Sequence, residues 1–341
     1  MYAISQNYPR AEVTLLSSPG RRGAPGASEL LEGASWLKQL IIYYSDDLAS
    51  RDRRRELLSQ LRASEFDIWF ELPASLVRMR EILRNMLVAR LAGAKWGYGW
   101  QLSTIRLAAQ AQSERFTFPT EVERLVSIVM ASGIPVESIS YPLPIREHHQ
   151  QRVSSLLNSV NTPLVAIAPG AKRPTNRWPV ERFAEVGRYL KDNFAILVLG
   201  GASEQKICAE VATAVGRSTL NLAGKTSLLE SAEILRRCRL AICNDSGTQH
   251  LAAAVGTPCI SIFSRRDLKG KWWPYGSQHT VLYKDIGCHT CFLDNCPYEN
   301  RCLNMVSAPE VVGSADRLLR PLAATQTPTI VRDFVGKGQP Q

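Results

Sequence analysis

Apolar residues recur along the chain in two alternating patterns: short continuous runs, and longer stretches with one apolar face. In the second half, runs such as 164–169 (LVAIAP) predict buried strands, and stretches such as 179–193 predict helices. Buried strands that alternate with helices indicate βαβ units and a parallel sheet covered on both faces. The predicted strands are 164–169, 194–200, 218–224, 239–244 and 258–263, and the helices are 179–193, 203–216, 227–238, 247–256 and 307–320.

The first half alternates in the same way but less regularly. The pattern predicts strands at 11–16, 37–44 and 66–72 and helices at 50–63, 75–93 and 120–133. A Pro-rich hinge, SYPLPIREHH (140–149), separates the halves, because its two prolines continue neither a helix nor a central strand. We therefore expect an α/β protein of two Rossmann-like parallel-sheet domains facing a cleft, 1–145 and 146–322, followed by a loose tail, 323–341.

Charge adds a preference for anionic ligands. Of the formal net charge of +10, residues 151–341 carry +8, which favours nucleotides, phosphorylated glycans or an acidic membrane face. No recognition-helix, zinc-finger or RNA-binding pattern is present, so a nucleic-acid partner is disfavoured. No apolar run approaches the ~18–20 residues of a membrane span, and the first residues, MYAISQNYPR, do not resemble a signal peptide. These features predict a cytoplasmic protein.

The stretch 244–263, NDSGTQHLAAAVGTPCISIF, follows a predicted strand and opens a predicted helix. In open α/β sheets ligands lie beyond the carboxyl ends of the strands, and the free N–H groups of a helix start bind anions. The glycine admits a phosphate close to the backbone, the hydroxyls donate, and the aspartate suits sugar hydroxyls. One capping residue would suffice for an ordinary helix, so several polar residues in a row favour a ligand. The candidate residues are Asp245, Ser246, Gly247, Thr248 and His250.

Two more loops follow strands in the same way. The loop 168–179 (APGAKRPTNRWP) carries Lys172 and Arg177 before a helix, which suits a phosphate, although a solvated basic loop is the alternative. The loop 198–205 (VLGGASEQ) places Glu204 after two glycines, as in a ribose site. A G-x-G-x-x-G fingerprint is absent, and LAGKTS (222–227) lacks the first glycine of a P-loop.

Taken in order, these loops resemble those of the heptosyltransferases, glycosyltransferase family 9, which have the GT-B fold. The resemblance covers residues 160–320 well and the first half less closely. It implies inverting transfer of a sugar, heptose, from a nucleotide-diphosphate donor such as ADP-heptose to a lipopolysaccharide-core acceptor, with no required cofactor. It assigns Glu204 to the donor ribose, 245–248 to the diphosphate and sugar, and His250 to the motif histidine.

The chain departs from the family pattern at two places. The lysine that the family usually has before RWP is Asn176 here. Asn176 is kept as a candidate donor-binding residue, and Arg177 or Lys172 would supply the charge. The family opens with a strand and a Gly-Asp loop whose aspartate is the expected general base. The start of this chain, MYAISQNYPRAEVTLL, resembles the segment after that loop, so we expect the strand and the base upstream of Met1. No other acid in residues 1–100 stands out, and a nucleotide-sugar-binding protein without its base is the alternative.

The eight cysteines fall into two sets. Cys208, Cys238, Cys243 and Cys259 lie in helix or strand patterns and are expected in the core. Four more lie within 15 residues in the order C-x2-C-x4-C-x5-C, a spacing compatible with structural zinc, an iron–sulfur cluster, free thiols or, less favourably in the cytosol, disulfides. A metal or redox module is therefore a third function to test. The candidate ligands are Cys288, Cys291, Cys296 and Cys302.

The predicted helix 75–93 carries the acceptor-side hypothesis. Its cations, with Lys95 just beyond, suit a phosphorylated lipid-linked acceptor or the inner leaflet of the inner membrane, although a solvated helix face is the alternative. The cations are Arg78, Arg80, Arg84, Arg90 and Lys95.

Overall fold

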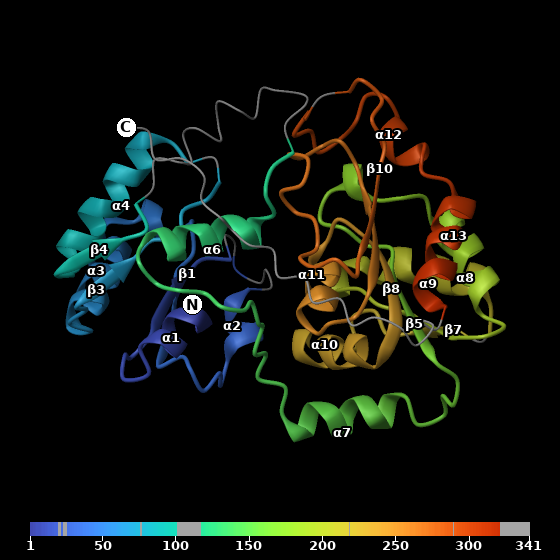
Figure 1. Cartoon of the computed structure of the whole chain (residues 1–341), viewed down its shortest axis with the longest axis horizontal. Coiled ribbons are helices and arrows are strands. Elements are labelled where there is room, and N and C mark those ends of the chain that lie inside the picture. Colours follow the sequence, from blue (N-terminus) through green and yellow to red (C-terminus); the bar gives the residue numbers. More distant parts are fainter. Residues whose placement is uncertain are drawn as a thin grey trace.

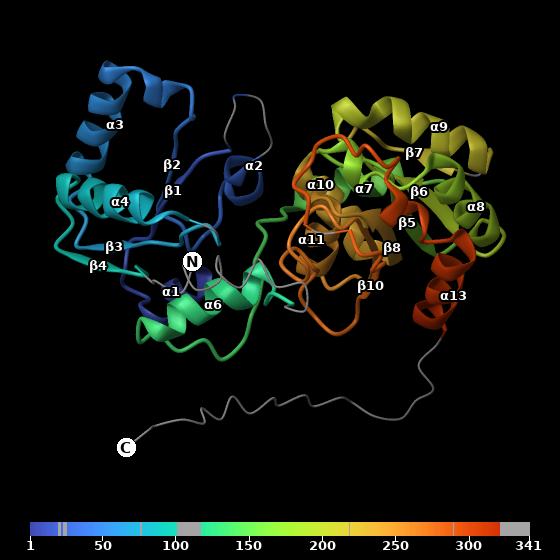
Figure 2. The same cartoon turned by 90° about the horizontal axis from the view of Figure 1, so that it is seen from above.

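The computed structural model describes residues 1–19, 22, 26–75, 77–100, 117–217, 219–288 and 290–320. The predicted loose tail lies outside the described residues. Two α/β halves lie side by side, the first coloured blue to teal and the second green to red (Figures 1 and 2). They differ strongly in how completely their sheets are built.

The second half holds one six-stranded sheet. Its order is β10-β9-β8-β5-β6-β7, and every neighbouring pair is parallel. The strands are β5 (Leu164–Ala168), β6 (Ala195–Val198), β7 (Thr219–Asn221), β8 (Cys238–Asn244), β9 (Cys259–Phe263) and β10 (Thr280–Tyr283). All five residues of β5 are buried, because helices cover both faces of the sheet.

Helices form two apolar layers on this sheet. Val165 and Ile167 face one core with α8, α9 and α13, while Ala166 and Ala168 face a second core with α7, α10 and α11. The alternation follows from the two-residue period of a strand. The helices are α7 (Glu147–Leu156), α8 (Val180–Leu190), α9 (Gln205–Val215), α10 (Leu228–Arg237), α11 (Gly247–Ala254), α12 (Arg301–Asn304) and α13 (Ala308–Leu319).

The first half has two separate two-stranded parallel sheets, β1-β2 and β3-β4. Its strands are β1 (Thr14–Ser17), β2 (Gln39–Ile42), β3 (Ile68–Phe70) and β4 (Trp96–Tyr98). Its helices are α1 (Tyr2–Asn7), α2 (Ala27–Leu31), α3 (Arg51–Ala63), α4 (Met79–Leu91) and α6 (Glu121–Ala131).

An open cavity of about 720 Å³ separates the two small sheets. Residues of β1 and β3 line it, together with apolar residues of α3 and α4 and with Met1. Each lining strand is paired on its other side, β1 with β2 and β3 with β4, so the unpaired edges of β1 and β3 both border the cavity. Protein interiors rarely leave such a volume empty, since a water molecule occupies only ~30 Å³.

Two backbone hydrogen bonds join the halves. Phe118 N donates to Lys269 O at 2.8 Å, and Glu121 N donates to Lys271 O at 2.8 Å. Gly270, between the two acceptors, has a φ of +94°, and a Cβ there would lie 2.2 Å from Phe118 O. Only glycine therefore permits this close approach.

The predicted strands and helices of the second half are confirmed, as is the burial of Cys208, Cys238, Cys243 and Cys259. The sequence analysis missed β4, β10 and the short helices α1, α2 and α12, and it missed α7, which begins inside the predicted hinge. No helix in the described part is both long and apolar enough to span a bilayer.

Candidate functional site

The ends of four adjacent strands meet at one edge of the second-half sheet. β6, β5, β8 and β9 are neighbours in that order, and all run in the same direction. Their following loops begin at Leu199, Pro169, Asp245 and Ser264. The carboxyl edge of a parallel sheet is where ligands bind in open α/β folds, and three of these loops are the ones singled out by the sequence.

Asn244, the last residue of β8, fixes the loop 169–179 to that edge. It is fully buried, its Nδ2 donates to Pro169 O at 2.8 Å, and its Oδ1 accepts from Trp178 N at 3.0 Å. A buried amide that satisfies two backbone groups is costly to lose. The loop that bears Lys172 is therefore held at both its ends against the next strand.

Asp245 is the centre of a buried polar network. Its Oδ2 accepts from Asn176 Nδ2 at 3.0 Å and its Oδ1 accepts from Gln249 Nε2 at 3.2 Å. Asn176 Oδ1 accepts in turn from Ser264 Oγ at 2.7 Å. The network joins the loops after β5, β8 and β9, so the carboxylate has one fixed position.

Among the described residues, no cation forms an ion pair with this carboxylate, since Arg266 pairs with Asp267 and Asp294. Burial raises the pKa of Asp245 to about 7, and the charge of Asp267 adds to the rise. Arg266 and the hydrogen bonds from Asn176 and Gln249 act in the opposite direction. Near neutral pH the group therefore exchanges between a carboxylate, which accepts two hydrogen bonds, and a carboxylic acid, which also donates. Both forms suit the hydroxyls of a sugar.

The start of α11 is open and lacks its own cap. Ser246 is the N-cap residue, but its side chain makes no capping bond. Its buried Oγ, and the buried Oε1 of Gln249, have no hydrogen-bond partner among the described residues. Nothing lies within 4 Å of a Cβ built on Gly247. Since buried polar atoms are normally paired, the free atoms and the open space beside a helix N-terminus indicate room for a ligand with polar groups.

The basic residues of the loop 168–179 divide into two roles. Arg177 Nε donates to Ala171 O at 3.0 Å, so part of this guanidinium holds the loop itself. Lys172 is exposed and makes no hydrogen bond or ion pair with a described residue. Asn176, at the place where the family usually has a lysine, is buried behind Asp245. Asn176 is therefore a positioning residue for Asp245, and Lys172 is the cation left available to a phosphate.

Glu204 reaches across from the loop after β6 to the loop after β5. Its Oε2 accepts from Gly201 N at 2.8 Å, and a Cβ at Gly170 would lie 2.2 Å from its Oε1. Gly170 thus leaves the space that the carboxylate occupies. Oε1 accepts no hydrogen bond from a described residue, so it remains available to a ribose hydroxyl, the role that the sequence predicts.

His250 and Thr248 lie on the first turns of α11, as predicted. The ring of His250 packs edge-on against Trp272 with 6.3 Å between centroids. Three contributors were missed by the sequence analysis: Gln249, Ser264 and Arg266. Gln249 lies inside the DSGTQH motif, but Ser264 and Arg266 reach the network from a strand end whose following loop carries no local signal.

The cysteine-rich loop between β10 and α12 packs against the loop 169–179, which follows β5. Thr175 Oγ1 donates to Leu293 O at 3.0 Å, Arg266 Nε donates to Leu293 O at 2.8 Å, and Arg173 pairs with Asp294. These contacts support the loop that holds Asn176.

The four predicted metal ligands themselves are all partly exposed. Cys302 Sγ accepts from Arg265 N and Cys296 Sγ from Tyr298 N, both at 3.4 Å. Burial, followed by the charges of the other three thiols, raises the pKa of Cys288. In the described part, which omits His289, no three His, Cys, Asp or Glu side chains are grouped to hold a metal. The metal site stays a prediction.

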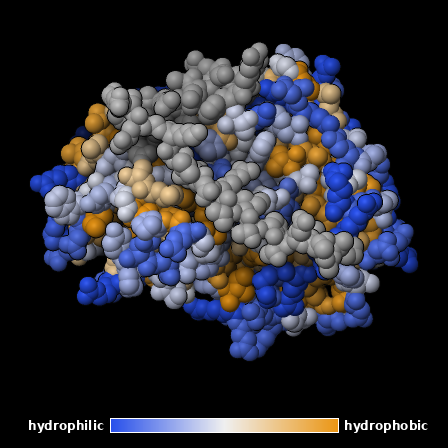
Figure 3. Space-filling view, viewed as in Figure 1, coloured by the Kyte–Doolittle hydropathy of each residue, from blue (hydrophilic) through white to orange (hydrophobic). Residues whose placement is uncertain are grey.

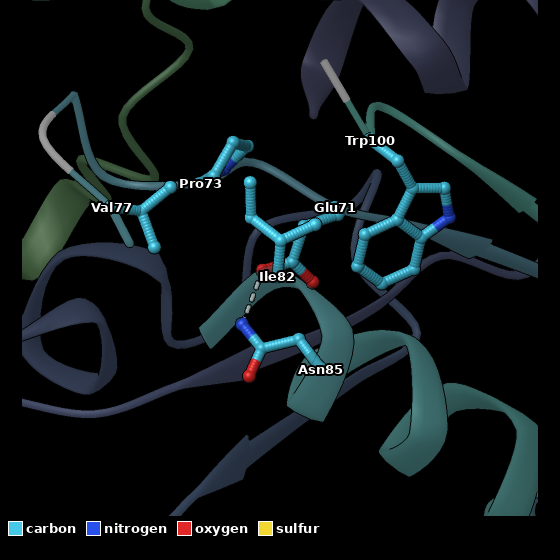
Figure 4. Close-up of a pocket in the computed structure, with 6 residues that line it drawn as sticks. All are labelled: Glu71, Pro73, Val77, Ile82, Asn85 and Trp100. Atoms are coloured by element: carbon cyan, nitrogen blue, oxygen red, sulfur yellow. Dashed lines mark hydrogen bonds between the residues drawn. The ribbon is translucent and has the colours of Figure 1, made fainter. Parts of the chain in front are cut away.

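The first half presents one acid at a strand end that the sequence analysis did not single out. Glu71 directly follows β3, and Figure 4 shows it beside Asn85 of α4, with Trp100 near by. Glu71 Oε1 accepts from Asn85 Nδ2 at 2.9 Å and Oε2 accepts from Trp69 Nε1 at 3.0 Å. Each carboxylate oxygen thus accepts one hydrogen bond and keeps a lone pair, so the two donors hold Glu71 in place without blocking it.

Comparison with known proteins gives one family. Residues 54–301 match the sequence model described as glycosyltransferase family 9 (heptosyltransferase). The chain is 26% identical over 231 residues to lipopolysaccharide heptosyltransferase 2 of Escherichia coli, covering 62% of this chain and 63% of that protein. It is 33% identical over 228 residues to lipooligosaccharide heptosyltransferase 2 of Haemophilus influenzae, covering 61% and 63%. The chain thus matches just under two-thirds of the length of these relatives.

The fold agrees with that assignment. The solved structure of E. coli ADP-heptose lipopolysaccharide heptosyltransferase II superposes with a TM-score of 0.66 at 21% identity, covering 93% of this chain and 92% of that one. The predicted GT-B architecture is therefore confirmed. The family model spans well over half of the chain and includes all three predicted donor-side loops. The chain belongs to glycosyltransferase family 9, the heptosyltransferases.

Proposed function

We propose that this chain is an inverting glycosyltransferase that moves a heptose from ADP-heptose to a lipopolysaccharide-core or related glycan, with a lipid-linked acceptor reached at the inner membrane. The observation that carries the proposal is the open start of α11. A free buried hydroxyl, a bare glycine and a fixed Asp245 share one helix N-terminus. This chemistry suits a diphosphate next to a sugar.

In the proposed reaction, the acceptor hydroxyl gives its proton to the general base and attacks the anomeric carbon on the face opposite the diphosphate. The bond to the diphosphate breaks, and the leaving group takes the electron pair. The N–H groups of α11 and the ammonium of Lys172 stabilise this developing charge. Asp245 and Glu204 orient the sugar and the ribose through their hydroxyls.

A thermal-shift panel with ADP, GDP, UDP and ADP-heptose tests the donor site. A ligand at 100 times its dissociation constant adds ~2.7 kcal/mol to the free energy of unfolding. We expect ADP and ADP-heptose to raise the unfolding midpoint most, and Asp245→Ala to reduce the response to ADP-heptose more than the response to ADP. Glu210→Ala, an exposed carboxylate on α9, is the matched control. If no nucleotide shifts a folded sample, the donor proposal is wrong.

The general base is a separate part of the proposal. We place it in a Gly-Asp loop upstream of Met1, as the resemblance implies. A form that carries this loop should transfer heptose ~10²–10⁴-fold faster than the chain that starts at Met1, with equal donor affinity. Glu71→Gln should leave the rate of both forms unchanged. A large loss of rate in Glu71→Gln would instead identify Glu71 as the base.

A nucleotide-sugar-binding protein without transferase activity is the second candidate. The sequence favours it, because no acid in residues 1–100 matches the aspartate that the family is expected to use as its base. Donor binding without transfer by the longer form would support this candidate over the enzyme.

The cysteine loop adds a metal to the proposal. Structural zinc or an iron–sulfur cluster at Cys288, Cys291, Cys296 and Cys302 would hold the loop that supports Thr175 and Arg173. Metal analysis of the purified chain beside Cys302→Ser tests this, with thiol titration as the second readout. Four freely titrating thiols and no bound metal would rule the metal out.

A further inference from the structure

The outward face of α4 combines apolar and cationic side chains. Met79, Leu83, Met86 and Leu87 follow the i, i+4, i+7, i+8 spacing of one helix face. A water-facing helix normally presents polar residues there, so this stripe has no partner within the described chain. The exposed fractions are 44% for Met79, 58% for Leu83, 43% for Met86, 57% for Leu87 and 41% for Leu91.

Another face of α4 packs against the rest of the first half. Ile82 and Ala89 are buried, and Asn85 bonds to Glu71 at the end of β3. The apolar stripe is therefore a second, outer face rather than a core face turned outward. Figures 1 and 2 both place α4 on the side of the first half that is away from the second half, and Figure 3 shows apolar surface over this helix at the upper left.

Cations lie among the apolar side chains. Arg78, Arg80 and Arg90 are exposed, and none of them forms an ion pair with a described residue. Glu81, the single acid of α4, accepts from Arg78 N at 3.1 Å and caps the helix. The face is thus strongly positive without internal compensation, which suits an anionic partner.

We propose that the outer face of α4 docks this chain on the surface of an anionic lipid bilayer. The arginines contact lipid phosphates while the Met and Leu side chains enter the headgroup boundary, as in interfacial amphipathic helices. This surface deepens the membrane contact of the proposed function. Vesicle binding is measured without donor or acceptor, so its failure would leave the transfer proposal standing.

The test is co-sedimentation of the full chain with vesicles of phosphatidylglycerol and phosphatidylcholine in equal parts, beside vesicles of phosphatidylcholine alone. We expect binding to the anionic vesicles only, weakening by at least tenfold between about 0.05 M and about 0.5 M salt. Binding that is equal on both vesicles, or no binding at low salt, overturns the proposal.

Matched variants locate the surface. Met79→Ser with Met86→Ser should weaken vesicle binding at least tenfold. Met130→Ser with Met305→Ser, which have similar exposed fractions of 48% and 49%, should not. Arg80→Gln with Arg90→Gln should also weaken binding about tenfold, whereas Arg217→Gln with Arg239→Gln, exposed cations of the second half, should have little effect.

Light scattering in solution examines the competing occupant, a second copy of this chain. A dimer that Met79→Ser with Met86→Ser converts to a monomer would assign the face to self-association and overturn the membrane proposal. A wild-type monomer that binds anionic vesicles supports it.

Discussion

The two halves of the molecule start from similar α/β patterns and reach different degrees of completeness. The second half closes six parallel strands between two apolar layers, and its central strand β5 is buried along its whole length. The first half holds two pairs of strands with an open cavity of about 720 Å³ between their unpaired edges. Two-stranded sheets are marginal on their own, so the comparison indicates that the described strands of the first half are less stable than those of the second.

The largest expected effect is on the hydrogen-exchange rates of β1 and β3, the strands that border this cavity. A single parallel strand between β1 and β3 would pair with both and give the continuous order β2-β1-new strand-β3-β4. Upstream residues that supply the predicted strand would fill the space.

Native-state hydrogen exchange can test that idea directly. In the chain that starts at Met1, we expect amides of β1 and β3 to exchange at least ~10³-fold faster than those of β5 and β8, since local opening costs much less where few apolar contacts are lost. In an upstream-extended form the two rates should converge. Equal protection in the shorter chain would contradict the comparison, and unchanged exchange in the longer one would contradict the added strand.

Two tryptophans, one in each half, allow the packing of the two halves to be compared. Trp178 is 1% exposed, its Nε1 donates to Val306 O at 2.9 Å, and its ring meets Phe183 edge-on at 4.9 Å. Trp178→Ala should cost ~3–5 kcal/mol of unfolding free energy. Trp69→Ala, at the edge of the cavity, should cost only ~1–2 kcal/mol, because its side chain is already partly exposed. Denaturant unfolding of both variants measures the difference, and equal losses would mean that the first half is packed as well as the second.

The same contrast explains what the sequence could predict. The second-half strands are continuous apolar runs, so 164–169 and 239–244 were identifiable without tertiary information. β4 and β10 were not, because WGY and TVLY are too short to show a strand pattern of their own. Short strands of this kind are set by their neighbours in the sheet rather than by their own pattern.

The residues of the candidate site also differ in how well the sequence predicts their positions. Asp245, Ser246 and Gly247 directly follow a clear strand, so their placement at the sheet edge could be predicted. The role of Asn176 could not, because its contacts with Asp245 and Ser264 join residues 69 and 88 positions apart. The sequence places Asn176 among the candidate donor-binding residues, and the structure shows that its side chain bonds to Asp245 and Ser264.

Asp245 gives the second half a pH dependence with a definite sign. Its pKa rises from 3.8 to about 7 on folding, so the folded chain holds this proton more tightly than the unfolded chain. The contribution is fully present below about pH 4 and is lost as the pH rises through 7. Three pKa units set an upper limit of about 4 kcal/mol, and partial exposure of Asp245 reduces the expected value to ~2 kcal/mol.

Unfolding at a series of pH values checks this. Asp245→Asn should flatten the stability profile between pH 4 and 8, and Asp192→Asn, an exposed aspartate after α8, should not. Asn176→Lys places a cation next to the carboxylate and should lower the pKa of Asp245, with the same flattening. A wild-type profile that rises across this range would show that the carboxylate is better stabilised than its neighbours indicate.

The smallest expected effect separates Lys172, the exposed cation of the loop 169–179, from Arg177, which holds that loop in place. Lys172 has no partner among the described residues, whereas Arg177 donates to Ala171 O. Lys172→Gln should therefore leave the unfolding midpoint unchanged and weaken ADP binding ~5–10-fold, about 1 kcal/mol for one phosphate contact, with the largest loss at low salt. Lys191→Gln, an exposed lysine at the end of α8, should change neither quantity. Titration calorimetry measures both variants. If the Lys172 and Lys191 variants bind ADP equally well, the phosphate charge comes from elsewhere, and Arg177 would have to serve both the loop and the ligand.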